Sequence, residues 1–221
     1  MEWLIDASAW VLPVILAITL HEAAHGWMAN KFGDDTAKQL GRITANPLKH
    51  IDKYGTIIVP GLLLLTKAPF IFGYAKPVPV NFSRLQPFRK GMFWVAVAGV
   101  LVNFALAIIT GLLLHIDGWI SPEEAPWLFQ NLYRSLQINC VLIVFNMIPI
   151  LPLDGGRAVY ALLPAALQRP YGRLERFGIW LVVLVFLVPM AFGITDIAQM
   201  AIAEPAFWLI SKVLWLTGNI E

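Results

Sequence analysis

The chain carries two histidines and a glutamate at a spacing that suits metal-dependent hydrolysis, in the string His21-Glu22-Ala23-Ala24-His25. On a helix, residues four apart lie one turn apart on the same face, so both imidazoles can reach one Zn²⁺. Glu22 then stands beside the metal, where it can act as a base toward water. The string therefore predicts a zinc site with His21 and His25 as ligands and Glu22 as the catalytic base.

This string lies in a run that is apolar enough to cross a membrane. From Ala7 to Asn30, Glu22 is the only formally charged residue. An ionisable residue in hydrocarbon is costly and is by default a candidate functional residue. The plainer alternative is a pair of histidines that pack a helix interface beside a neutralised glutamate. No basic residues precede the run and no small-residue cleavage site follows it, so we interpret it as a retained helix and not as a signal peptide.

The composition assigns the chain to the integral membrane proteins. Hydrophobic residues make up 58% of its 221 residues and charged residues only 14%, whereas about one quarter of a soluble domain is charged. The net charge of +2 is too small to suggest a nucleic-acid partner. The lipid bilayer is therefore the expected surrounding of most of the chain.

Further apolar runs indicate the elements that must position the motif. Runs free of charge extend over about residues 92–114, 136–153 and 177–194, while 54–74 and 206–218 are marginal because lysines or prolines interrupt them. We expect an all-α polytopic membrane protein with about five to six transmembrane helices. Residues 1–221 should form a single domain whose core covers roughly residues 7–195.

Lysines and arginines gather in three blocks, at residues 31–53, 76–90 and 157–176, and acidic residues dominate the other connections. By the positive-inside rule these blocks are cytoplasmic and the N-terminus is external, with Arg134 as the clear exception. Because basic blocks flank residues 54–74 on both sides, this segment should enter and leave the membrane from the cytoplasmic face as a re-entrant loop. We therefore expect a multi-pass protein of the cell membrane with its active site toward the cytoplasm.

A zinc site needs a third protein ligand, and the best candidate is Asp154. It ends the string Asn146-Met147-Ile148-Pro149-Ile150-Leu151-Pro152-Leu153-Asp154, which Gly155 and Gly156 follow. The prolines remove helix hydrogen bonds and the paired glycines permit sharp turns, so this helix end should unwind and can turn the carboxylate inward. Both motifs lie near the cytoplasmic ends of their helices and hence at similar depth. A cap or turn role is the alternative for Asp154, and His50 and His115 lie in or near connections where a solvated histidine is the plainer interpretation.

Together these strings resemble the site-2 protease family of intramembrane zinc metalloproteases. The Asn146–Gly156 string is similar to that family's Asn and Pro-Leu-Asp-Gly motif, and the strings Gly41–Leu48 and Lys76–Asn81 resemble those of its short prokaryotic members. Residues 98–103, Ala-Gly-Val-Leu-Val-Asn, are similar to its Gly-Pro-x-x-Asn motif, although Val100 stands where proline is usual. The resemblance covers roughly residues 10–195, and no appended PDZ domain fits in this length.

The resemblance implies that His21, His25 and Asp154 bind one Zn²⁺ and that Glu22 is the general base and acid. It further implies that Asn146 holds the substrate or the developing oxyanion, and Asn103 is a second candidate for substrate binding. Residue chemistry agrees, because zinc lowers the pKa of its water toward about 7 and polarises a peptide carbonyl while a glutamate takes the proton. Both asparagines have a plain alternative as hydrogen-bonding contacts between membrane helices.

The predicted activity is hydrolysis of peptide bonds within or near a transmembrane helix of another protein. A helix hides its amides in internal hydrogen bonds, so the substrate must first unwind. The resemblance implies help from β-strand addition at short membrane-associated strands, with Arg42–Ala45 and Val78–Asn81 as candidate edges. Two other interpretations compete. A membrane metal-ion carrier would want more ligands along a path, and the intact Glu22 argues against a non-catalytic protein that only binds membrane helices.

Overall fold

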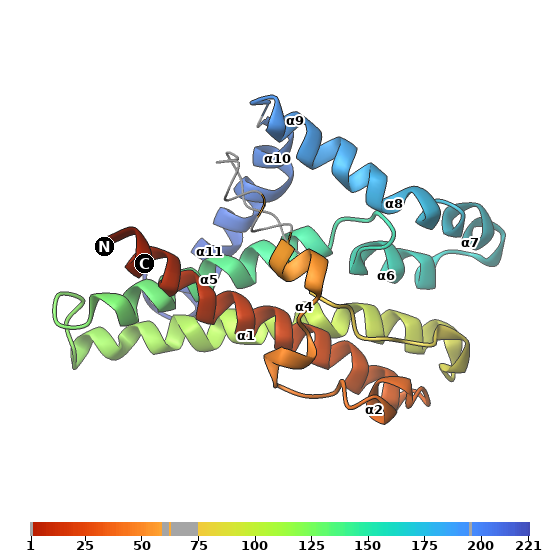
Figure 1. Ribbon diagram of the computed structural model, residues 1–221, viewed down its shortest axis with the longest axis horizontal. Coiled ribbons are helices and arrows are strands. Elements are labelled where there is room, and N and C mark those ends of the chain that lie inside the picture. The colour runs from red at the N-terminus through yellow and green to blue at the C-terminus, as the bar shows by residue number, and fades with distance from the viewer. Residues whose placement is uncertain (1, 59–61, 63–74, 195) are drawn as a thin grey trace.

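The computed structural model describes residues 2–58, 62, 75–194 and 196–221, and most of these residues are helical (Figure 1). The all-α part of the sequence prediction is confirmed. In an apolar surrounding, backbone N–H and C=O groups must find hydrogen-bond partners within the protein. A helix satisfies them within its own segment and needs no partner strand, which explains this outcome.

Three long helices form the core of the molecule: α1 (Glu2–Lys31), α4 (Phe88–Leu113) and α5 (Pro126–Asn146). Each packs against the other two, and Figure 1 shows α1 running along α4 with α5 beside them. In the described part of the chain, two helical stretches are long and apolar enough to cross a membrane, Ser8–Lys31 and Phe88–Gly118. The predicted number of five to six spans stays a prediction.

The C-terminal third forms an arch of shorter helical pieces beside this core (Figure 1). They are α6 (Asp154–Leu162), α7 (Ala165–Gly172), α8 (Glu175–Val182), η5 (Val183–Leu187), α9 (Val188–Ala191), α10 (Asp196–Ala198), η6 (Gln199–Ala203) and α11 (Glu204–Leu216). The last of them returns to pack on α5 and α4. The run expected at 177–194 is helical as far as residue 191, and the marginal run at 206–218 belongs to a longer helical stretch that ends at residue 216.

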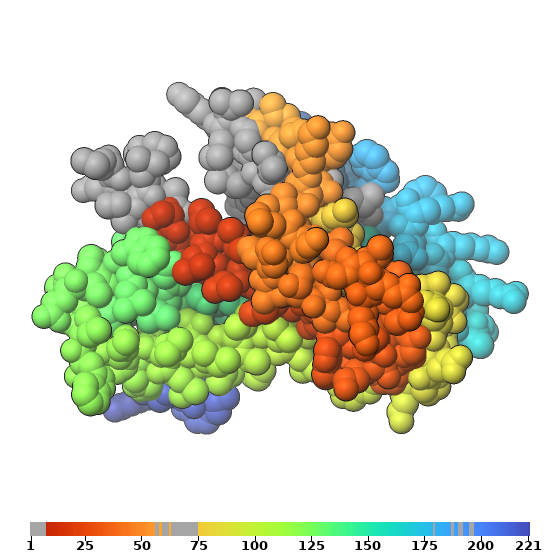
Figure 2. Space-filling model, turned by 60° about the horizontal axis from the view of Figure 1, so that its bottom comes forward, coloured from red at the N-terminus to blue at the C-terminus, as the bar shows by residue number. Residues whose placement is uncertain are grey.

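Short elements connect α1 to α4 and α4 to α5. They are α2 (Thr36–Gln39), η1 (Pro47–Lys49), η2 (Lys53–Ile58), η3 (Phe82–Arg84) and η4 (Leu114–Gly118). Figure 2 shows the residues that follow α1, coloured orange-red, massed over the middle and right of one face. The fully buried Asp34 carboxylate joins two parts of this connection, because it accepts hydrogen bonds from the backbone N–H groups of Asn81 (2.6 Å) and Thr36 (3.1 Å).

The membrane-associated β-strands expected at 42–45 and 78–81 are absent from the described residues, so this part of the fold prediction is wrong. The two segments lie side by side, but side chains form hydrogen bonds with backbone groups in or next to the second segment, in place of a backbone ladder between strands. Glu22 accepts the N–H of Val78 at 2.7 Å, and Arg42 donates to two carbonyls just before the second segment. Bonded in this way, the segments adopt irregular backbone instead of strand.

The two ends of the segment 51–75 meet at a backbone hydrogen bond, in which the N–H of Lys76 donates to the carbonyl of His50 at 2.9 Å. Most of the re-entrant loop expected at 54–74 lies outside the described residues, which include only 54–58 and 62 of it. A chain that leaves and returns at one point suits entry and exit on one membrane face.

This junction predicts the result of cysteine labelling in a Cys140→Ser background. Lys49→Cys and Lys76→Cys replace exposed side chains and leave the joining backbone bond intact. We expect an impermeant thiol reagent to label both from the same face of sealed vesicles. Labelling from opposite faces would show that residues 54–74 cross the membrane.

Candidate metal centre

Three potential metal ligands converge where α1 meets the start of α6. His21 Nε2 lies 3.0 Å from His25 Nε2, and Asp154 Oδ2 lies 3.1 Å from the first nitrogen and 3.3 Å from the second. His21 and Asp154 are each only 7% exposed. Residues 129 and 133 positions apart in the sequence thus present three ligand atoms to one point.

The separations fit a metal ion held by all three atoms. Zinc bonds of about 2.0–2.2 Å at a tetrahedral centre put ligand atoms roughly 3.3–3.6 Å apart, close to the observed distances. The buried Oδ2 of Asp154 has no hydrogen-bond donor among the described residues. A cation at the centre of the triangle satisfies this orphaned oxygen and both nitrogens at once.

Hydrogen bonds on the far side of each imidazole direct the lone pairs toward that point. The Nδ1–H of His25 donates to the carbonyl of Val95 at 2.7 Å, and the Nδ1–H of His21 donates to Oδ1 of Asn103 at 2.5 Å. Both acceptors are on α4. With its proton on Nδ1, each neutral imidazole presents the unprotonated Nε2 that metal coordination requires.

A short polar relay across three helices fixes the Asn103 amide in this orientation. Its Nδ2 donates to Oδ1 of Asn139 at 2.8 Å, and Nδ2 of Asn139 donates to the carbonyl of Ser135, also at 2.8 Å. Because each nitrogen is committed as a donor, Oδ1 of Asn103 must face His21. Asn139 is 1% exposed and was missed by the sequence analysis, although an amide in the middle of an apolar run was the available signal.

Gly99 gives the His21 ring its space against α4. A Cβ at this glycine would lie 2.5 Å from the ring, which no real side chain tolerates. Asn103 follows one turn later on the same face of α4. The spacing of glycine and asparagine in this string therefore has a physical cause, since one position admits the ring and the other holds it.

Asp154 reaches the histidines because the chain between α5 and α6 is folded tightly on itself. The run predicted at 136–153 is helical only to Asn146, so the helix end unwinds as expected. The glycines that follow act differently from our interpretation. Gly155 and Gly156 have helical backbone with no positive φ, and a Cβ at either would collide with backbone of residues 147–151. They allow close approach, and the carboxylate sits in the first turn of α6, where the helix dipole favours it.

Glu22 is half-buried beside the triangle and is held by the segment that crosses α1. Its Oε2 accepts the N–H of Val78, and in the part of the chain that the structure describes this is its only hydrogen bond. One turn farther along, Gly26 admits the Val78 side chain, since a Cβ there would lie 2.9 Å from Cγ1 of that valine. The second carboxylate oxygen is left without a partner among these residues.

The other candidate residues bond to groups outside the three ligands or, in the case of Asn103, to His21. Asn146 donates its Nδ2 to the carbonyl of Leu142 on its own helix at 3.0 Å. His115 contacts the carbonyl of Thr217 at 2.7 Å and is exposed, as the plainer interpretation expected. His50 contacts the carbonyl of Thr44 at 3.0 Å but is only 3% exposed, so it is a buried and not a solvated histidine. Asn103 is fully buried behind His21, a position that favours holding the ring over the substrate contact that we expected.

Comparison with known proteins agrees with this geometry. Residues 123–190 match the sequence model of the family described as Peptidase family M50. The chain is also 37% identical over 184 residues to a protein of Bacillus subtilis named "Putative zinc metalloprotease YwhC", covering 81% of this chain and 80% of that one. The chain belongs to peptidase family M50. The resemblance to site-2 proteases found in the sequence is thereby confirmed, and the chain is a zinc metalloprotease by family.

More distant M50 relatives carry similar names. "Putative zinc metalloprotease Rip2" of Mycobacterium tuberculosis is 26% identical over 203 residues, which are 91% of this chain and 70% of the relative. "Zinc metalloprotease MJ0392" of Methanocaldococcus jannaschii is 25% identical over 167 residues, 73% of this chain and 35% of the relative. No solved structure matches the chain. Zinc is the cofactor that these names and the cluster of His21, His25 and Asp154 support.

The relay predicts that a residue with no contact to the metal controls zinc affinity. In Asn139→Leu the Asn103 amide loses its anchor, and His21 loses its fixed acceptor. We expect zinc affinity, measured by competition with a chelator, to fall by about 10–100-fold.

Asn131→Leu is the matched control for this prediction. It removes another buried amide of α5, whose Nδ2 donates to the carbonyl of Trp127 on the same helix. Zinc affinity should stay within about twofold of wild type in this variant. Equal affinities in wild type and Asn139→Leu would mean that the relay does not orient His21.

Proposed function

We propose that this M50 protein is an intramembrane zinc endopeptidase that hydrolyses peptide bonds within or near transmembrane helices of protein substrates. The observation that carries the proposal is the convergence of three ligand atoms within 3.3 Å, two of them on a helix apolar enough to span a membrane. A soluble protease has no reason to bury such a site in an apolar helix, since each ionisable group there is costly.

In this proposal His21, His25 and Asp154 hold one zinc ion, and Glu22 moves the proton. Zinc, when bound, supplies a Lewis acid that lowers the pKa of water and polarises the scissile carbonyl. The Val78 N–H holds Oε2 of Glu22, so the carboxylate is oriented while Oε1 remains available. Glu22 takes a proton from the attacking water and delivers it to the leaving amine. Asn103 and Asn139 act through His21, as positioning residues.

Placement in the membrane follows from the charge pattern. We propose a multi-pass protein of the cell membrane with an external N-terminus and with the metal centre toward the cytoplasm. The basic blocks at 31–53, 76–90 and 157–176 support this orientation, as does the junction between His50 and Lys76. His25 lies six residues before the end of α1, which is about 9 Å at 1.5 Å per residue. Water can reach that depth from the cytoplasmic side.

The proposal predicts that Glu22→Gln separates zinc binding from catalysis. A glutamine oxygen still accepts the Val78 N–H, so the fold and the zinc content should be those of wild type. Cleavage of a panel of transmembrane substrates should fall by about 10²–10⁴-fold, the usual contribution of a general base. Asp154→Ala is the complementary variant and should lose both zinc and activity.

Metal analysis of purified protein run in parallel with the cleavage assay decides between the interpretations. About one zinc per chain in wild type and Glu22→Gln, with activity only in wild type, supports proteolysis. Zinc flux into vesicles with no cleavage of any substrate would instead indicate a metal carrier. Stoichiometric zinc in Asp154→Ala would remove that residue from the ligand set.

Asn146 is the proposed donor to charge that develops in the transition state. One of its amide hydrogens is bonded to the carbonyl of Leu142, and among the described residues the other has no acceptor. We expect Asn146→Ala to keep its zinc and its melting temperature in detergent and to cleave about a hundredfold to a thousandfold more slowly. A hydrogen bond between membrane helices contributes on average only about 0.6 kcal/mol to stability. A variant with normal turnover and lowered stability would therefore show that Asn146 has only a packing role.

A further inference from the structure

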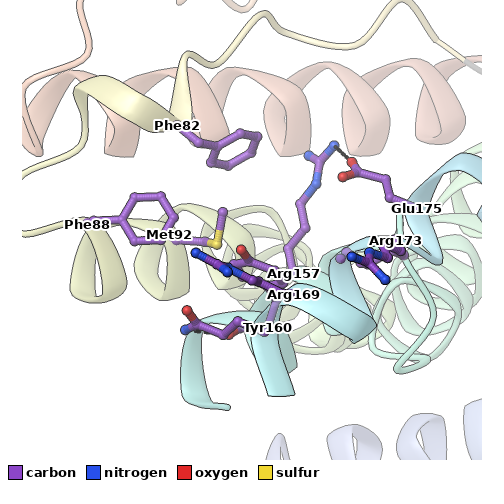
Figure 3. Close-up of a pocket in the computed structure, with 11 residues that line it drawn as sticks. Phe82, Phe88, Met92, Arg157, Tyr160, Arg169, Arg173 and Glu175 are labelled. Atoms are coloured by element: carbon purple, nitrogen blue, oxygen red, sulfur yellow. Dashed lines mark hydrogen bonds and ion pairs between the residues drawn. The ribbon is translucent and has the colours of Figure 1, made fainter. Parts of the chain in front are cut away.

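A cavity of about 530 Å³ lies between α4, α6 and the chain that leads to α8 (Figure 3), and none of the three metal ligands lines it. Its walls differ in chemistry. Phe82, Phe88 and Met92 form an apolar side, and arginines from the other elements face them. The cationic side chains are Arg157, Arg169 and Arg173, with Glu175 as the acidic one.

Charge in this cavity is unbalanced. Arg157 lies 3.9 Å from the Glu175 carboxylate, and its guanidinium also stacks 5.0 Å from the ring centre of Phe82. Among the described residues, the guanidinium groups of Arg169 and Arg173 have no acceptor. Three cations against one carboxylate leave a net charge of +2 beside an apolar wall, at the exposed mouth of the cavity where Arg169, Arg173 and Glu175 lie.

This combination selects an anion with several acceptor oxygens attached to an apolar body. Guanidinium groups bind phosphate through planar, paired hydrogen bonds, and they are weakly enough hydrated to work beside apolar surface. Basic pockets on the cytoplasmic side of membrane proteins take up phospholipid headgroups. The arginines belong to the block at 157–176 that the charge pattern assigns to the cytoplasm.

We propose that this pocket binds a phosphate group, supplied by the headgroup of an anionic phospholipid of the cytoplasmic leaflet. The phosphate would bridge Arg169 and Arg173, and the glycerol and upper acyl chain would lie along Phe82, Phe88 and Met92. The lipid source rests on the proposed membrane topology, whereas the phosphate site itself does not.

The pocket shares its supporting chain with the metal cluster. Arg157 stands three residues after Asp154 on the nine-residue helix α6. The hydroxyl of Tyr171, between the two unpaired arginines, donates to the carbonyl of Pro149 at 2.9 Å in the loop before Asp154. A phosphate held by Arg169 and Arg173 therefore sits on the stretch of chain that Tyr171 joins to the loop before Asp154.

Binding can be measured on the full chain in detergent with dioctanoyl phosphatidylglycerol, dioctanoyl phosphatidylcholine and inorganic phosphate as separate probes. We expect the anionic lipid to bind at least about tenfold more tightly than the zwitterionic one, as measured by native mass spectrometry. The double variant Arg169→Gln/Arg173→Gln should lose at least about tenfold in affinity for it, since two charge-assisted contacts disappear.

Arg176→Gln is the matched control, because its guanidinium lies in the same basic block but stacks on Phe177 at 4.7 Å and does not line the pocket. Its affinity for the anionic lipid should equal that of wild type. Inorganic phosphate that binds as tightly as the lipid would make free phosphate the source. Equal binding of both lipids together with no phosphate binding, or full affinity in the double variant, would overturn the site. None of these readouts depends on proteolysis.

Discussion

The rest of the structure depends on three lone pairs that face one another inside an apolar helix bundle. Two imidazole nitrogens and a carboxylate oxygen lie 3.0–3.3 Å apart, and both neutral rings donate their Nδ1–H to α4, which leaves the Nε2 lone pairs facing one another. The three lone pairs repel one another until a cation occupies the centre. The surrounding apolar medium strengthens both this repulsion and the attraction of the lone pairs to a cation. The hydrogen bonds that the two Nδ1–H groups donate serve this arrangement, because they keep the proton of each imidazole on the side away from the other ring.

The bundle meets this demand with very few polar groups. Helix α4 supplies the Val95 carbonyl and the Asn103 amide, and α5 supplies Asn139, so each core helix contributes to the same centre. In a membrane protein such buried amides need complete pairing, since no water can satisfy them. Each member of the relay from His21 to Ser135 is donor to the next or acceptor from it. Complete pairing makes the relay a rigid support.

Much of the fold and part of the site could be predicted from sequence, for definite physical reasons. Helical period puts His21 and His25 on one face, and the prolines before Asp154 mark where α5 must end. Long-range partners are harder, because nothing in the local pattern says that Asn139 faces Asn103 or that Arg42 takes backbone carbonyls. The β-strand prediction failed for that reason, since extended-looking segments pair only if side chains leave their backbone groups free.

The glycines give the same lesson at atomic scale. Gly155 and Gly156 looked like turn residues, yet both are helical and are small because neighbouring backbone touches them. Gly99 is likewise defined by the ring that it faces. A sequence identifies where a side chain is missing, whereas only the packed molecule shows what fills the space.

The backbone bond between His50 and Lys76 fixes where the intervening chain begins and where it ends. It closes the chain on both sides of residues 51–75, so this stretch begins and ends at one fixed point beside α1. Doubling the length of a flexible closed loop costs only about 0.6 kcal/mol, and neither end needs to move when the contents change. Because this bond fixes both ends, a change in the length of the stretch would leave the described residues on either side, and with them the metal ligands, in place.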